Sequence, residues 1–200
     1  MGDSTIMSDE WDDIASRATT ETVVANYRNP CAFQSELRDF LVKECGQQGS
    51  CIEVGAAFGV TSALLPLGWK RHLSDQSAIC LEKAKLFYSE IGQQAELIQA
   101  DILQPQAFGI GQFDLVFSAG LIEHFNLDER RAMARNCFRI CRPGGHVCFA
   151  FPNHCSLPYR LSYLYLRLRR RWPYPAEFRI ADMEQETAGI AGARLLKTVS

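Results

Sequence analysis

Short apolar segments alternate with helical segments between residues 51 and 151, and this alternation constrains the fold more than any other feature. The expected strands are 51–54, 72–74, 96–100, 113–118 and 146–151, and the expected helices between them are 60–65, 77–91 and 128–141, with a turn at 142–145. Strands joined through helices pair in parallel by right-handed crossovers. Near-continuous apolar strands indicate that both faces of the sheet are covered. The pattern predicts a doubly wound, mostly parallel α/β sheet with helices on both faces and ligands at the carboxyl ends of its strands.

The segment before the first strand is expected to contain two helices. Apolar residues recur at helical spacing from Thr19 to Gly46, and Asn29-Pro30 interrupts them. Residues 1–13 carry five acidic residues and no basic one, which is typical of a solvated lead-in. We therefore divide the chain into residues 1–46, an acidic lead-in with helices packing on the core, and residues 47–200, the sheet domain.

Composition narrows the classes of partner. The chain has 21 Lys and Arg against 23 Asp and Glu, a formal net charge of -2, so we expect a small-molecule partner and no duplex nucleic acid. No apolar run reaches the roughly 18 residues of a membrane span, and the N-terminus does not resemble a signal peptide, so we expect a cytoplasmic protein. The eight cysteines form no CxxC pair, and we expect no metal site.

The turn after the first strand carries the clearest binding motif. It reads Glu53-Val-Gly55-Ala-Ala-Phe-Gly59, in which the glycines allow a tight turn and close approach of a ligand to the backbone. The glycine spacing is one residue longer than in a dinucleotide motif, and the acidic residue favours a cationic or zwitterionic ligand. A purely structural bend would show the same pattern.

Two aspartates follow at the ends of later strands. Asp75 follows the second strand, where a carboxylate can accept the hydrogens of ribose hydroxyls. Asp101 ends the third strand, where a carboxylate can accept an adenine amino proton. A single aspartate at such a place is commonly a helix cap or turn residue, but two at these offsets favour a nucleoside-containing ligand.

With these motifs, the chain resembles the class I S-adenosylmethionine-dependent methyltransferases, within them the small-molecule group. The resemblance covers residues 49–153 through IEVGAAFG, LSDQS, LIQAD, FDLVFSAGLIEHF and CRPGGHVCFAFPN. It implies a Rossmann-like fold, S-adenosylmethionine as cofactor and a small-molecule acceptor. The implied cofactor contacts are Glu53, Gly55 and Gly59 with the methionine half, Asp75 with the ribose, Asp101 and Ile102 with the adenine, and Ala119-Gly120 at the sulfonium.

The chain departs from the family pattern in two places. The second strand, residues 70–74, is unusually polar. Residues 194–199 have the pattern of a sixth strand, and no residues remain for the antiparallel seventh. We expect a sheet that lacks this last strand, closes differently or is covered at its edge by a partner. The alternative function is a methyltransferase-like binding or regulatory module without turnover.

His124 is the expected general base, because an unperturbed imidazole titrates near neutrality, and Glu123 beside it is expected to orient His124 or the acceptor. The alternative is that both residues only hold their turn. His154, after the fifth strand, is a further residue that could reach the same crevice. The motifs of enzymes that methylate DNA amino groups or cytosine carbon are absent from the corresponding turn at 118–121.

Residues 157–172, LPYRLSYLYLRLRRRW, form a basic aromatic insertion between the fifth and sixth strands, which we place at about 157–175. It could cover an apolar acceptor, make peripheral contact with an anionic membrane or attract a phosphorylated substrate. It could also be an amphipathic helix that only packs on the domain.

Overall fold

The computed structural model describes residues 4–104, 108–172 and 174–193, and for residues 4–10 the backbone alone. Its sheet has five strands in the order β3-β2-β1-β4-β5, and every neighbouring pair is parallel. The strands are β1 (Gln48–Val54), β2 (Gly68–Asp75), β3 (Glu96–Gln99), β4 (Phe113–Ala119) and β5 (Cys141–Ala150). The predicted doubly wound sheet is confirmed. The expected sixth strand, 194–199, lies outside the described residues.

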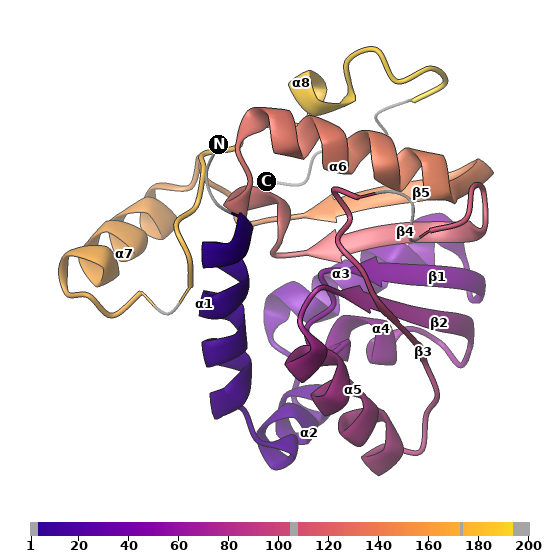
Figure 1. The fold of residues 1–200 in the computed structure, drawn as a ribbon, viewed down its shortest axis with the longest axis horizontal. Coiled ribbons are helices and arrows are strands. Elements are labelled where there is room, and N and C mark those ends of the chain that lie inside the picture. The colour runs from indigo at the N-terminus through magenta and orange to yellow at the C-terminus, as the bar shows by residue number, and fades with distance from the viewer. Residues whose placement is uncertain (1–3, 105–107, 173, 194–200) are drawn as a thin grey trace.

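Helices cover both faces of this sheet (Figure 1). They are α1 (Ser4–Arg17), α2 (Thr20–Arg28), α3 (Ala32–Cys45), α4 (Val60–Leu64), α5 (Ala78–Glu90), α6 (Leu127–Ile140), α7 (Leu157–Leu168) and α8 (Glu184–Thr187), with a 3-10 turn η2 (Ile122–His124). On one face, Ile52, Val54 and Val116 pack against Met133 and Cys137 of α6. On the other face, helices α2 to α5 cover the alternate residues of the strands. This alternation follows from the two-residue repeat of a strand, which sends successive side chains to opposite faces.

Two local expectations are corrected. The acidic segment expected to be a solvated lead-in contains the start of a helix, because α1 begins at Ser4 and its second half packs on α5. The turn expected at 142–145 belongs to β5, which begins at Cys141 and pairs with β4 through a register shift between Phe113 and Leu115. Gly145 fits this irregular pairing because an added Cβ would lie 2.8 Å from the carbonyl oxygen of Asp114.

The polar second strand is accounted for by hydrogen bonds that satisfy its buried side chains. The Arg71 guanidinium donates to the carbonyl oxygens of four residues around α4, namely Ser62, Leu65, Pro66 and Trp69. His72 Nδ1 lies 2.9 Å from the carbonyl oxygen of Cys51 on the neighbouring strand. Both side chains are buried, so this strand belongs to the core despite its sequence.

Candidate functional site

The turn after β1 adopts a left-handed backbone at alternate residues. Gly55 has φ 65°, Ala57 φ 47° and Gly59 φ 69°. A Cβ added at Gly55 would lie 2.5 Å from Leu121 Cδ2, and one at Gly59 would lie 2.5 Å from Leu73 Cδ1. Both glycines are therefore needed for backbone conformation and for space. The turn after β1 also lies directly against the loop after β4.

Asp75 holds this turn from the end of β2. Its Oδ2 accepts a 2.8 Å hydrogen bond from Ala57 N–H, and its Oδ1 accepts a 2.9 Å bond from Ser77 N–H. Burial raises the pKa of this carboxyl, although the two N–H donors oppose the shift. The side chain stays partly exposed, so each carboxylate oxygen keeps capacity for a further donor such as a hydroxyl.

Glu53 lies beneath the turn and is buried. Its Oε2 accepts a 3.0 Å hydrogen bond from Ser62 N–H in α4. Burial raises its pKa to about 7. The carboxyl group therefore ties β1 to the helix that follows the glycine turn, and its contact with the methionine half of the cofactor stays a prediction.

Asp101 and Ile102 follow β3 on the same edge of the sheet. The backbone N–H of Ala100 donates to the carbonyl oxygen of Asp75 at 3.0 Å, which joins the ends of β2 and β3. Asp101 Oδ1 accepts a 2.8 Å bond from Leu103 N–H, as expected of a turn residue, and its side chain is partly exposed. Ile102 is buried.

The loop after β4 brings Ala119, Glu123 and His124 to this edge. Gly120 follows Ala119 at φ 76° and donates its N–H to the carbonyl oxygen of Ala150 at the end of β5. An added Cβ at Gly120 would lie 3.7 Å from Glu123 Oε1, so the Glu123 carboxyl borders the loop. Within the described residues its Oε2 is buried without a hydrogen-bond partner. Burial, assisted by the charge of Glu177, raises the Glu123 pKa to about 8.

His124 is held by a segment from the far end of the chain. Its Nδ1 lies 3.2 Å from the carbonyl oxygen of Ala176. A carbonyl oxygen only accepts, so Nδ1 carries a proton and donates it to Ala176, which orients the ring. Phe178 N–H donates to the carbonyl oxygen of Glu123 at 2.7 Å, which holds the same turn from its other side.

His154 is occupied by structural hydrogen bonds. Ile180 N–H donates to its Nδ1 at 3.2 Å, and its Nε2 lies 3.1 Å from Glu177 Oε2. Tyr159 O–H also donates to Glu177 Oε2, at 2.7 Å. Burial alone would raise the pKa of Glu177, but these bonds from His154 and Tyr159 lower it. His154 therefore anchors the segment around residues 177–180 and is not a candidate base.

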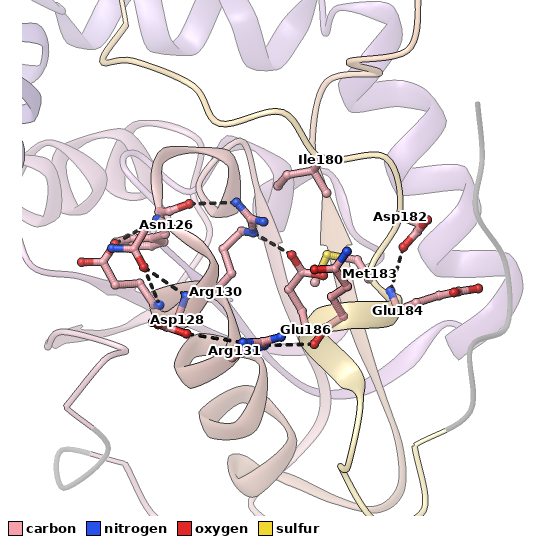
Figure 2. A network of polar contacts seen from close by, with 12 residues as sticks. Asn126, Asp128, Arg130, Arg131, Ile180, Asp182, Met183, Glu184 and Glu186 are labelled. Carbon is pink, nitrogen blue, oxygen red and sulfur yellow. Dashed lines mark hydrogen bonds and ion pairs between the residues drawn. The ribbon is translucent and has the colours of Figure 1, made fainter.

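A buried ion pair fixes the same segment further along (Figure 2). Arg130 Nε of α6 lies 2.7 Å from Glu186 Oε1 of α8, and these side chains are only 10% and 3% exposed. Arg130 also donates to the carbonyl oxygen of Phe125, next to His124. The chain from residue 174 to α8 is thus held at both ends over the loop after β4.

Helix α1 crosses the carboxyl edge of the sheet and was not predicted from the sequence. Asp12 bonds to the hydroxyl of Ser77 at the start of α5, and Trp11 packs edge-on to His124 with ring centroids 5.3 Å apart. Lys83 Nζ donates to carbonyl oxygens at the end of the helix, including that of Ala15 at 2.6 Å. α1 therefore spans from the end of β2 to the loop after β4 (Figure 1). The five acidic residues of segment 1–13 indicated a solvated segment, so the sequence did not predict that this helix packs at the edge of the sheet.

The described residues hold neither a cluster of metal-binding side chains nor a helix that could span a membrane. No three or more His, Cys, Asp or Glu side chains in these residues are grouped as metal ligands would be. None of the described helices combines the length and hydropathy needed to cross a membrane.

Comparison with known proteins agrees with this geometry. Residues 52–145 match the model of a methyltransferase domain family. A ubiquinone biosynthesis O-methyltransferase of Escherichia coli O7:K1 is 33% identical over 73 residues, which are 36% of this chain. The match spans only 30% of the length of that enzyme.

Solved structures share the fold. The PH0226 protein from Pyrococcus horikoshii OT3 is 24% identical with a TM-score of 0.59, covering 64% of this chain and 60% of its own. An S-adenosylmethionine-dependent methyltransferase from Clostridium acetobutylicum is 17% identical with a TM-score of 0.56, covering 68% of this chain and 56% of its own.

Proposed function

Because the chain belongs to the class I S-adenosylmethionine-dependent methyltransferases, we propose that it transfers the methyl group of S-adenosylmethionine to a hydroxyl of a small apolar molecule. The observation that carries the proposal is the convergence of Gly55, Asp75 and Glu123 at one edge of the sheet. These residues lie at or after the carboxyl ends of three different strands, and each borders the turn after β1 or the loop after β4.

The residues at this edge fit the cofactor. Gly55 lets Leu121 of the loop after β4 pack directly on the turn, because a Cβ there would lie 2.5 Å from Leu121 Cδ2, so the two loops that would border the cofactor meet at this residue. Asp75 is partly exposed and keeps acceptor capacity for ribose hydroxyls. Asp101 and Ile102, one polar and one apolar, suit the amino edge and the face of an adenine. Glu53 supports the turn from below.

Bound S-adenosylmethionine supplies an activated methyl group on a sulfonium. The chain then has to align an acceptor and take its proton. His124 is our candidate for this task, and the contact of its Nδ1 with the Ala176 carbonyl oxygen at 3.2 Å fixes the orientation of the ring. Glu123, with a pKa of about 8, is protonated at neutral pH and offers a hydrogen bond beside Gly120.

Aromatic rings extend from His124 toward α7 and support an apolar acceptor. Trp11 lies 5.3 Å from His124, and Tyr174 lies 6.2 Å from Trp11, between ring centroids. Trp172 continues the row 5.8 Å from Tyr174. The named activity of the Escherichia coli relative favours an oxygen acceptor.

One argument for the alternative function, a binding module without turnover, no longer holds. The polarity of the second strand is explained by the bonds of Arg71 and His72 within the core. A defective strand is therefore no reason to expect loss of activity.

The test is transfer of a labelled methyl group from S-adenosylmethionine to a pool of small hydroxylated metabolites. We expect a labelled product with the native chain, and with His124→Gln a loss of at least about a hundredfold while cofactor affinity is retained. Cofactor binding without any labelled product from a broad pool would favour the binding module. Absence of cofactor binding would contradict the methyltransferase and would leave a binding or regulatory module.

A further inference from the structure

The side of α7 that faces away from the domain carries an exposed leucine ridge. Leu157, Leu161, Leu164 and Leu168 recur at helical spacing, and their side chains are 68%, 59%, 55% and 76% exposed. No residue of the helix is buried. In Figure 1 the helix projects from the body of the domain, beyond α1.

Basic residues border this ridge. Arg160 and Arg167 lie along one side of it, each with its guanidinium over the ring of Tyr163, at 5.5 and 5.7 Å. Arg169, Arg170 and Arg171 follow the helix, and all five arginines are exposed. Residues 157–172 contain no Asp or Glu, so the segment carries five positive charges and no negative one.

The opposite side of α7 is the one that packs. Tyr159 donates to Glu177 and stacks with Tyr163, whose ring lies 4.9 Å from that of Trp172. The helix is therefore oriented by its aromatic side, and the leucine ridge is presented outward with arginines at its border.

We propose that the leucine ridge of α7 docks the protein on a bilayer surface that contains anionic phospholipid. An interfacial helix inserts its apolar side at the boundary of headgroups and acyl chains, while bordering arginines stay at the level of the phosphates. Each such arginine near an anionic surface adds about 1 kcal/mol of attraction.

Two other occupants fit less well. A second copy of this chain would bring ten arginines together across a symmetric contact, with no acidic residue from either segment to balance them. A nucleic acid would pair with the arginines, but it would leave four exposed leucines without an apolar partner.

The experiment is sedimentation of the full chain with vesicles, without cofactor or acceptor. Phosphatidylcholine vesicles are compared with vesicles that also contain phosphatidylglycerol, at about 0.1 M and about 0.5 M salt. We expect binding to the anionic vesicles at low salt and at least about a tenfold loss at high salt, where the screening length falls to about 4 Å. At low salt, binding to vesicles of phosphatidylcholine alone should be at least about tenfold weaker than binding to the anionic vesicles.

Two pairs of substitutions separate the contribution of the leucines to membrane binding from that of the arginines. Leu161→Gln with Leu164→Gln, and Arg160→Gln with Arg167→Gln, should each weaken binding at least about tenfold. Leu86→Gln is the control for the first pair. Leu86 lies on α5, and its exposed fraction of 56% is close to the 55% of Leu164. Arg28→Gln with Arg135→Gln, two exposed residues on α2 and α6, is the control for the second.

The proposal is overturned if no binding occurs at low salt, or if the leucine pair binds as tightly as the native chain. Binding to RNA that depends on the arginines but not on the leucines would assign the surface to nucleic acid. A concentration-dependent dimer that the leucine pair abolishes would assign it to a second copy. Each result is independent of whether methyl transfer is observed.

Discussion

The carboxylate of Asp75 holds Ala57 in a left-handed conformation, through a 2.8 Å hydrogen bond from the Ala57 N–H to Asp75 Oδ2. A residue with a Cβ rarely adopts φ 47°, so this bond keeps the turn after β1 in a shape the chain alone would avoid. The aspartate that the cofactor's ribose would contact is thus also the residue that shapes the glycine turn. Under the proposed function, cofactor binding and turn geometry would therefore depend on the same side chain.

Replacement of Asp75 should therefore lower cofactor affinity more than a lost ribose contact alone. We expect Asp75→Ala to weaken S-adenosylmethionine binding by about 1.5–3 kcal/mol or more, measured by calorimetric titration. Asp75→Asn, which keeps one acceptor oxygen, should lose less. Equal affinity of the native chain and Asp75→Ala would contradict the assignment.

Ala57→Gly should relieve backbone strain at the turn. A left-handed alanine costs about 1–2 kcal/mol, and glycine adds back about 0.5–1 kcal/mol of unfolding entropy. We expect unchanged or slightly higher stability in urea unfolding. Ala25→Gly in the middle of α2, the same exchange at an exposed right-handed position, should lower stability by about 1 kcal/mol. A loss at Ala57 as large as that at Ala25 would contradict the strain argument.

The strands and the edge of the sheet could be predicted because their signals are local. Residues 51–54 and 113–118 are apolar runs bounded by polar turns, and Gly55, Asp75 and Asp101 stand directly after strands. Parallel pairing then brings these positions together without further information.

The elements that cover the site could not be predicted in this way. Lys83 bonds to the end of α1 across 65 to 68 residues, and Glu186 pairs with Arg130 across 56. Such pairs leave no periodic pattern in the sequence. The acidic segment 1–13 also looked solvated, since a helix that buries only part of its length shows a weak apolar side.

Stability should fall as pH rises through the range where Glu123 titrates. The native carboxyl keeps its proton up to a pKa of about 8, whereas its ordinary value is 4.5. Between these values the unfolded chain binds fewer protons than the native one, so raising the pH favours unfolding. Its contribution is complete below pH 4.5 and is lost as pH passes about 8.

Glu123→Gln should therefore flatten the decline of thermal stability between pH 5 and about 8.5. The exposed Glu82→Gln on α5 serves as the control and should leave the profile unchanged. Glu53, whose pKa is raised to about 7, acts in the same direction and should account for a residual slope. A native profile that rises over this range would refute the assignment.

Removing one partner of the buried Arg130–Glu186 pair should lower the free energy of unfolding strongly. Glu186→Ala leaves a guanidinium buried without its partner, which costs about 3–5 kcal/mol in urea unfolding. The double variant Arg130→Met with Glu186→Leu should recover a large part of this loss. Lys70→Met, which removes an exposed pair with Glu96 far from α8, should cost less than about 1 kcal/mol. Equal effects of Glu186→Ala and Lys70→Met would show that the buried pair does not anchor α8.

The central claim, that the cofactor binds against the glycine turn after β1, is tested most directly by titrating S-adenosylmethionine into Gly55→Ala and Gly92→Ala. Both glycines have left-handed backbones, at φ 65° and 66°, so both variants carry similar strain. Only at Gly55 does the added Cβ meet a neighbour, Leu121 Cδ2 at 2.5 Å, whereas Gly92 has open space around it. We predict that Gly92→Ala binds the cofactor like the native chain and that Gly55→Ala binds at least about tenfold more weakly. Native affinity in Gly55→Ala would contradict the account.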